Sequence, residues 1–378
     1  MEQKSIKKVL ILQRAIPNYR LPLFQALCAL KDFEITIGCA EHDEKTSTGI
    51  PADNYSGVRI KPVKIYKLGG KFFFQSIVSL KNYDLVITDI SINVLSVPVY
   101  LLLTRLKGVK IIGWGKGVPQ RIDTKESWLQ KAYKKFIAGS CDALILYGHI
   151  SKGYFEKLGL KNKPMFIAQN SVHTEKFFSA FEENEAAAMQ LRTEMKLSDR
   201  FVFGYFGKLT GRKAVDNIIE AFRIVKKSSP NSFLLIAGSG PETNRLKQLA
   251  ADLVEQGSVY FMGRVPNGKE GGVLHLIDGY LTFSQGGLGI LEAMASRRTI
   301  ISTPESFPET ELLQGDENCF LSSDFSVQSF AQAMLKAVNN RQLALQMGVR
   351  AQQTVKEKAG TSVMVKAFAD AINYTLSK

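Results

Sequence analysis

The sequence has few cysteines and histidines and no long apolar run. The four cysteines lie far apart without a C-x-x-C pair, so they predict neither a disulfide framework nor a zinc site and fit a reducing compartment. The four histidines show no metal-ligand spacing. The apolar run Val9–Leu12 is too short for a signal peptide, and the longest run, Val94–Leu103, falls short of the about 20 residues of a membrane-spanning helix. We therefore expect a cytoplasmic protein without a membrane span.

Acidic residues are scarce in the first half of the chain. Residues 1–175 hold 26 Lys and Arg against 14 Asp and Glu, whereas residues 176–378 hold 23 against 21. The first half therefore carries most of the formal net charge of +14, and we expect it to meet an anionic partner. A chain of 378 residues with 45% hydrophobic residues is neither disordered nor fibrous and has room for two globular domains.

Basic and aromatic residues alternate in two stretches of this half. They are Lys61, Lys64, Lys67 and Lys71 followed by Phe72–Phe74, and Trp128–Ile137 with Lys131, Lys134 and Lys135. On a helix, the second stretch forms an apolar face flanked by cations, which suits an anionic membrane surface. The alternative is a solvated helix whose aromatic residues belong to the core. The sequence carries no helix-turn-helix, zinc-finger or RNA-binding signature, so we expect no nucleic-acid partner.

Short apolar runs alternate with helical stretches along both halves, which predicts an α/β fold. We expect strands at Lys8–Leu12, Glu34–Gly38, Asp84–Thr88, Lys110–Trp114, Ala143–Tyr147, Met165–Ala168, Phe201–Phe206, Ser232–Ala237, Ser258–Met262, Ile277–Phe283 and Thr299–Ser302. Continuous apolar runs of this length are typical of parallel sheets buried on both faces. The acidic segment 176–200 lacks a strand pattern, so we expect two Rossmann-like, doubly wound domains that meet near residues 172–200 and face each other across a cleft.

Three glycine turns follow strands of the second half. Gly207 lets the chain turn tightly before Lys208, Arg212 and Lys213, which together suit a diphosphate; the alternative is an ordinary basic loop. Gly286 and Gly287 precede a helix whose exposed N–H groups favour an anion, unless these glycines only permit close packing. Glu292 lies in this helix, where a buried carboxylate needs polar partners such as sugar hydroxyls. The turn Ala237–Glu242 lacks a G-x-G-x-x-G pattern, which disfavours a nicotinamide dehydrogenase.

Four motifs in order resemble the second domain of retaining GT-B glycosyltransferases of family four, the group 1 type. They are G-K-L-x3-K at Gly207–Lys213, A-G-S-G-P-E at Ala237–Glu242, V-x-F-M-G-R-V at Val259–Val265 and G-L-G-I-L-E-A-M-A at Gly287–Ala295. The first half is more loosely similar to one branch of the family, through Y-R-L-P-L-F at Tyr19–Phe24, W-G-K-G at Trp114–Gly117 and the turn Asn170–Val172. The resemblance implies an acceptor domain at 1–175, a nucleotide-sugar domain at 176–360, and a helix at 361–378 that packs back on the acceptor domain.

The resemblance also implies roles for particular residues. Lys213 matches the family's diphosphate lysine, Lys208 matches the arginine of G-R-L, and Glu292 matches the second glutamate of E-x7-E, which holds the donor ribose; we expect these three to be catalytic. The donor-binding residues would be Gly207, Arg212, Gly238, Gly240, Arg264, Val265, Ser284, Gly286, Gly287, Leu288 and Glu292. Our candidates for acceptor contacts are Asn18, Arg20, Asp89 and Lys116, each of which has an alternative as a strand-end cap or a surface charge.

Three positions depart from the family pattern. Ser284 stands where the first glutamate of E-x7-E belongs, which puts the donor sugar and full activity in doubt. Lys208 keeps the charge of the usual arginine but loses its bidentate fork. Lys116 stands where related sequences often have histidine, and a lysine would act as a base only with a strongly lowered pKa.

The expected mechanism depends on how the leaving group is stabilised. A departing nucleoside diphosphate gains negative charge, which must be stabilised by cations or by a metal. The sequence has no D-x-D motif, so we expect transfer from a UDP- or GDP-linked sugar to a glycan or lipid-linked acceptor, with retention and with neither metal nor cofactor. The enzyme would work at the inner face of the cell membrane in surface polysaccharide, lipopolysaccharide or glycolipid synthesis. The alternatives are a nucleotide-sugar 2-epimerase and a non-catalytic nucleotide-sugar or membrane-binding protein.

Overall fold

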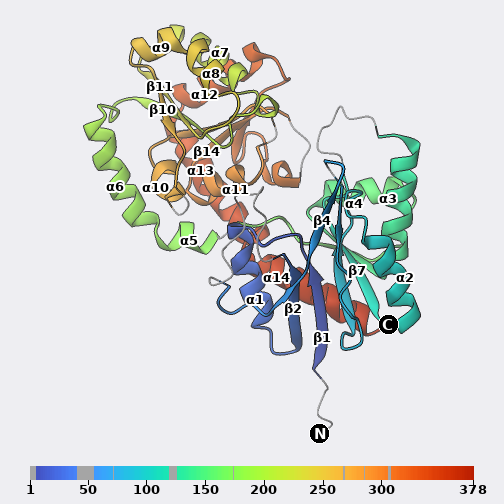
Figure 1. The fold of residues 1–378 in the computed structure, drawn as a ribbon. Helices are drawn as coiled ribbons and strands as arrows, with labels where there is room; N and C mark the ends of the chain where they lie inside the picture. Colours follow the sequence, from blue (N-terminus) through green and yellow to red (C-terminus); the bar gives the residue numbers. More distant parts are fainter. Residues whose placement is uncertain are drawn as a thin grey trace. The chain divides into compact units, whose positions relative to one another are not determined.

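The computed structural model describes residues 6–40, 55–70, 72–118, 126–172, 174–266, 269–284, 286–304 and 308–378. The chain forms two compact units, each considered by itself below (Figure 1). Unit 1 comprises Met1–His173 and Thr361–Lys378, and unit 2 comprises Thr174–Gly360. Within the described ranges, no helix is both long and apolar enough to cross a bilayer.

Unit 1 contains a seven-stranded parallel sheet in the order β3-β2-β1-β6-β7-β8-β9. Its strands are β1 (Lys7–Leu12), β2 (Phe33–Cys39), β3 (Ile60–Pro62), β6 (Leu85–Asp89), β7 (Lys110–Gly115), β8 (Ala143–Leu146) and β9 (Met165–Ile167). A separate antiparallel hairpin joins β4 (Ile65–Leu68) to β5 (Phe72–Gln75). The apolar runs of β1, β6 and β8 are buried, as expected for strands that are covered on both faces.

Helices cover the two faces of this sheet in two groups. One face packs against α1 (Leu21–Cys28) and α14 (Thr361–Leu376), and the other packs against α2 (Val97–Lys107), α3 (Trp128–Ser140) and α4 (His149–Lys157). The reason is that the chain moves one way from β1 to β2 and the opposite way from β6 through β9, and right-handed crossovers then place their helices on opposite faces.

The helix α14 belongs to unit 1 although unit 2 separates it in sequence from the rest. Its Met364 and Phe368 lie in the same buried cluster as β1 and β7. The Phe368 ring meets the Trp114 ring edge-on, with centroids 4.9 Å apart. The core of unit 1 is therefore completed by residues that follow unit 2.

Unit 2 contains a six-stranded parallel sheet in the order β12-β11-β10-β13-β14-β15. Its strands are β10 (Phe201–Phe206), β11 (Ser232–Ala237), β12 (Val259–Gly263), β13 (Gly279–Thr282), β14 (Thr299–Ser302) and β15 (Cys319–Leu321). Its helices are α5 (Thr174–Ser179), α6 (Phe181–Glu194), α7 (Val215–Ser228), α8 (Thr243–Leu249), α9 (Ala251–Glu255), α10 (Glu270–Leu274), α11 (Leu288–Ala295), α12 (Val327–Asn339) and α13 (Arg341–Lys358).

The predicted α/β class with two Rossmann-like sheets is confirmed. Every expected strand is present, with ends that agree to within two residues. The short strands β3, β4, β5 and β15 were not expected. The helix α6 occupies most of the segment 176–200 that lacked a strand pattern.

Candidate functional site

The sheet of unit 2 changes its winding direction between β10 and β13. These strands are neighbours, but the chain leaves β10 toward β11 and leaves β13 toward β14, on the opposite side. The segments that follow the two strands therefore diverge at the carboxyl edge of the sheet, which is where ligands bind in open α/β folds. Both segments carry predicted donor residues.

The segment after β10 leads through cations into α7. Gly207 has a φ of +153°, and Lys208 is exposed directly after it. A short 3-10 helix, Gly211–Lys213, then precedes Ala214, whose φ of +46° opens α7. Arg212 in this helix is exposed and Lys213 is half-buried.

The loop after β11 holds the β10 loop in place. The amide of Gly207 donates to the carbonyl of Ala237 at 3.0 Å, and the amide of Leu209 donates to that of Ser239 at 3.0 Å. A β-carbon at Gly238 would lie 1.8 Å from the Gly207 carbonyl oxygen, and one at Gly240 would lie 2.1 Å from that of Leu209. These two predicted donor residues therefore allow close packing of the two loops.

The segment after β13 ends at the start of α11. Gly287 is the N-cap with a φ of +62°, and no side chain caps the first turn. A β-carbon at Gly287 would lie 3.7 Å from Nζ of Lys213, so this ammonium group lies beside the first turn of α11. Gly286 and Leu288 flank Gly287. The structure thus brings together a lysine and a helix start that the sequence predicted separately, and both favour an anion.

Two buried tyrosines that sequence reasoning missed support this arrangement. The Tyr280 hydroxyl donates to the carbonyl of Phe206 at 3.2 Å, and the Tyr205 hydroxyl donates to that of Lys208 at 3.3 Å. Burial raises the pKa of both hydroxyls, so both stay protonated donors. Glu292 is half-buried, and its charge further raises the pKa of Tyr280. The sequence signal that could have identified them is a tyrosine next to a glycine in a buried strand.

The remaining predicted donor residues follow β12 and β13. Arg264 is exposed and Val265 half-buried after β12, at the sheet edge two strands away from β10. Ser284 is half-buried directly after β13, and its carbonyl accepts a hydrogen bond from the Thr282 hydroxyl at 3.1 Å. Among the described residues, no three His, Cys, Asp or Glu side chains are grouped as a metal site.

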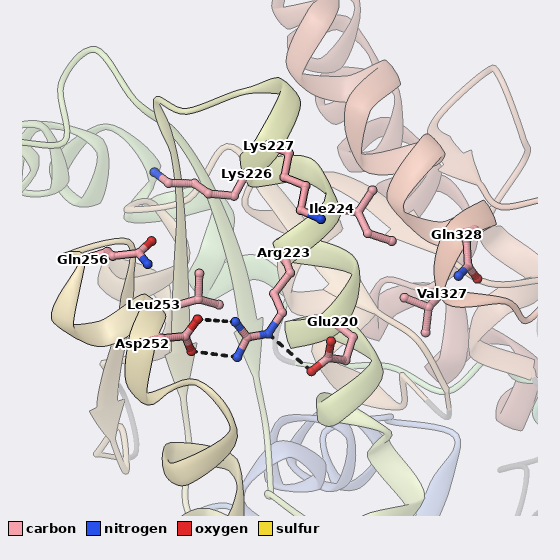
Figure 2. A pocket seen from close by; sticks show the side chains of 10 residues that line it. All are labelled: Glu220, Arg223, Ile224, Lys226, Lys227, Asp252, Leu253, Gln256, Val327 and Gln328. Atoms are coloured by element: carbon pink, nitrogen blue, oxygen red, sulfur yellow. Dashed lines mark hydrogen bonds and ion pairs between the residues drawn. The ribbon is translucent and has the colours of Figure 1, made fainter.

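A surface pocket of about 740 Å³ lies elsewhere in unit 2, among α7, α9 and the start of α12 (Figure 2). Arg223 pairs there with Asp252 and Glu220, and Lys226 donates to the backbone carbonyls of Pro230 and Ser232. Because protein groups satisfy these charges, we favour the loops at the winding change as the ligand site.

In unit 1, Arg20 is buried rather than presented to solvent. Its Nη2 donates to the Tyr147 hydroxyl at 2.8 Å and to Oδ1 of Asn170 at 3.0 Å. Its guanidinium lies over the Trp114 ring, 4.6 Å from the centroid. Burial raises the pKa of Tyr147 to about 12, so its hydroxyl stays neutral. Arg20 thus joins the start of α1 to the segments after β8 and β9.

The other three acceptor candidates have different surroundings. Asp89 Oδ1 accepts hydrogen bonds from the amide and hydroxyl of Ser91, at 2.6 and 2.5 Å. Burial raises the pKa of Asp89, against the hydrogen bonds from Ser91 and the charge of Arg20. Lys116 is half-buried after β7, and Asn18 is exposed before α1. Arg20 and Asp89 are thus close enough to interact electrostatically.

Comparisons with known proteins point to glycosyltransferases. Residues 190–354 match the model of the Glycosyl transferases group 1 family. The chain is 25% identical over 243 residues to an uncharacterized glycosyltransferase of Methanocaldococcus jannaschii, covering 63% of this chain and 60% of that protein. It is 21% identical over 173 residues to the poly(ribitol-phosphate) alpha-N-acetylglucosaminyltransferase of Staphylococcus aureus, covering 46% of this chain and 35% of that enzyme. The chain thus spans less than two thirds of either relative.

A solved structure extends the similarity to both units. The Anabaena protein HepE, in complex with UDP-glucose, matches with a TM-score of 0.72 at 15% identity, over 97% of this chain and 99% of HepE. At this identity the likeness concerns the fold, which is GT-B. Taken with the motifs, these similarities show that residues 190–354, somewhat less than half of the chain, match the glycosyl transferases group 1 family.

Proposed function

We propose that the protein is a glycosyltransferase that moves a sugar from a UDP- or GDP-linked donor to a glycan or lipid-linked acceptor. In this proposal the transfer proceeds with retention and without a metal, in surface polysaccharide, lipopolysaccharide or glycolipid synthesis at the inner face of the membrane. The observation that carries the proposal is the position of the Lys213 ammonium beside Gly287, at the start of α11. A diphosphate bound there would meet a cation and the positive end of a helix together.

The proposed catalysis rests on stabilising the leaving group. When the sugar–phosphate bond breaks, negative charge grows on the diphosphate, and Lys213 and the first turn of α11 oppose it without reorganising. One cation about 4 Å from such a charge contributes roughly 4 kcal/mol at an effective dielectric of 20, which corresponds to roughly three powers of ten in rate. Lys208 and Arg212 would add a longer-range attraction. The diphosphate itself would accept the acceptor's proton.

The remaining donor contacts are part of the same proposal. Glu292 would accept hydrogen bonds from the donor ribose, four residues into α11. The backbone of Gly286, Gly287 and Leu288 would approach the phosphates and the sugar, and the loops after β11 and β12 would hold the base. Ser284 offers a hydroxyl where relatives have a carboxylate, so we expect it to influence which sugar is accepted.

Two findings guide the choice of substrates. HepE was solved with UDP-glucose, which supports a UDP-linked donor as the first to test. The S. aureus relative is named for poly(ribitol-phosphate), an anionic polymer, and the excess of cations in residues 1–175 suits an anionic acceptor or one embedded in anionic lipid.

The test combines turnover with stereochemistry. Purified protein is incubated with UDP- and GDP-sugars and extracted lipid-linked acceptors, with EDTA present, and the anomeric configuration of the product is read by NMR. We expect product with the configuration of the donor, and its loss in Lys213→Ala but not in Lys247→Ala, an exposed lysine on α8. Inversion, or dependence on a divalent ion, would contradict the mechanism.

One specific observation favours a second candidate, a non-catalytic nucleotide-sugar-binding protein. Ser284 removes a carboxylate that family members often use near the donor sugar. Calorimetric binding of UDP-sugars, with no transfer to any acceptor and no donor hydrolysis, would favour this candidate. Isomerisation of the donor without an acceptor would instead indicate a 2-epimerase.

A further inference from the structure

The solvent side of α3 displays three large apolar side chains among polar ones, which is unusual for a surface helix. Trp128, Leu129 and Phe136 are 75%, 59% and 57% exposed. Ile137 and Ala138 are buried and make the contacts of α3 with the core. The exposed aromatic residues are therefore not needed to attach the helix to the sheet.

The neighbouring helix α2 also exposes apolar side chains. α2 contacts α3 and exposes Leu102 (58%) and Leu106 (72%), whereas its Tyr100 and Leu101 are buried. We call the five side chains Leu102, Leu106, Trp128, Leu129 and Phe136 the α2–α3 surface. Both helices lie on the same face of the unit 1 sheet, because they belong to consecutive crossovers in one direction (Figure 1).

Four exposed cations accompany the α2–α3 surface. They are Arg105, Lys107, Lys131 and Lys135. None of them forms an ion pair with a residue that the structure describes. Lys134 differs from the sequence-based expectation, because it is buried and pairs with Glu126 at 2.5 Å. The exposed charges that α2 and α3 themselves carry are therefore positive.

The start of α3 is fixed by specific bonds. Ser127 and Gln130 form a reciprocal capping box. Lys134 also donates to the Gly117 carbonyl at 2.5 Å, and the Tyr154 hydroxyl donates to Glu126 at 2.6 Å. Trp128 is therefore displayed by an ordered helix, with little conformational entropy left to lose on binding.

We infer that the α2–α3 surface docks on an anionic lipid bilayer. Exposed tryptophan and phenylalanine insert favourably at the level of the headgroups, and flanking lysines pair with anionic lipid while their stems cover the apolar boundary. Unpaired positive charge around the apolar centre favours this partner over a second copy of the chain, whose equal cations would repel. The inference rests on the proposed function, since it assigns the surface that would bring the enzyme to a lipid-linked acceptor.

The experiment measures vesicle binding of the full chain. Flotation with phosphatidylglycerol–phosphatidylcholine vesicles is compared with phosphatidylcholine alone, at low and high salt. Trp128 is a built-in probe, because the only other tryptophan, Trp114, is 2% exposed. We expect binding to anionic vesicles, weakened by salt, with a blue shift of the emission and quenching by brominated lipid.

Two variants separate the apolar and charged contributions. Lys131→Glu/Lys135→Glu should weaken partitioning at least 30-fold, given roughly 1 kcal/mol per cation near the surface. Trp128→Ala/Phe136→Ala should weaken it at least tenfold and abolish the blue shift. The matched control is Leu345→Ala/Val349→Ala on α13, which removes side chains of similar exposure (58% and 54%) from unit 2 and should not change binding. Circular dichroism checks that each variant is folded.

The outcomes distinguish this inference from the proposed function. Absent flotation, flotation unaffected by both variants, or self-association of the wild type that both variants abolish would overturn the inference. Donor binding and donor hydrolysis in solution should be unchanged in the α3 variants, because these steps use residues of unit 2. Loss of donor binding in the wild type, with vesicle binding retained, would overturn the proposed function alone.

Discussion

Lys208 and Lys213 carry the same charge in different environments. Lys208 is exposed, whereas Lys213 is half-buried and reaches the start of α11. Since solvent and salt screen an exposed charge, Lys213→Ala should lower kcat/KM by about a hundredfold or more and Lys208→Ala by about tenfold. Steady-state kinetics with the best donor measures both, at 0.05 and 0.5 M salt. Equal effects of the two substitutions would contradict the assigned roles.

Arg20 holds unit 1 together through its planar guanidinium. Arg20→Lys keeps the charge but cannot contact Tyr147, Asn170 and the Trp114 ring together. We expect a loss of about 1–3 kcal/mol in the free energy of unfolding, measured by urea titration with tryptophan fluorescence. The control is Arg59→Lys, because the Arg59 side chain is 57% exposed and surface pairs contribute little. An unchanged midpoint for Arg20→Lys would show that the network is dispensable.

At the scale of elements, the close contact between the loops after β10 and β11 requires glycine at two positions, Gly238 and Gly240. Gly238→Ala would place a β-carbon 1.8 Å from a backbone oxygen, and the residue has a φ of +140°, so the β10 loop must shift. We expect at least a tenfold loss of UDP affinity in calorimetry and a stability loss above about 1 kcal/mol. The matched control is Gly211→Ala in the same loop system, where a β-carbon meets nothing within 4 Å. Similar affinities for the two variants would refute this dependence.

The packing of α6 against the rest of unit 2 should respond to pH. Burial by itself raises the pKa of Glu185, but the hydrogen bond from His275 and the charge of Arg298 outweigh it, so the pKa lies below its usual value. Because the folded-state pKa is lowered, the stabilisation is present above the ordinary glutamate pKa and is lost as pH falls through the folded-state value. Glu185→Gln should therefore cost about 1 kcal/mol at pH 7 and progressively less toward pH 3, as measured by urea unfolding. A cost that stays constant over this range would contradict the ion-pair explanation.

At the scale of the whole molecule, the two units should respond differently to a donor. The proposed donor residues belong to unit 2. Hydrogen exchange with 1 mM UDP should slow at residues 207–213 and 286–292, while the strands β1, β6 and β7 of unit 1 stay unchanged. Mass spectrometry of peptides measures this. Protection confined to the pocket of Figure 2 would show that the nucleotide binds there and not at the loops after β10 and β13, which would contradict our assignment.

The sequence predicted those features that are encoded locally. Long buried strands such as β1 and β10 are recognisable as continuous apolar runs. The loop glycines and Lys213 are recognisable because they come shortly after such runs in the sequence. The strands β3 and β15 span three residues each, so pairing with a neighbour, and not a local pattern, makes them strands. The role of Tyr280 depends on the Phe206 carbonyl at the end of the neighbouring strand, and the burial of Lys134 depends on its ion pair with Glu126. Such pairings are set by tertiary structure.

The position of α14 has a consequence for how the polypeptide matures. A ribosome would release all of unit 2 before it supplied Met364 and Phe368, which the hydrophobic cluster of unit 1 requires. At about 5–20 residues per second, the nascent first half would wait roughly 10 to 40 s for its missing helix. Unit 1 is therefore translated first but completed last. During that delay the apolar surface that α14 later covers would be open to chaperones.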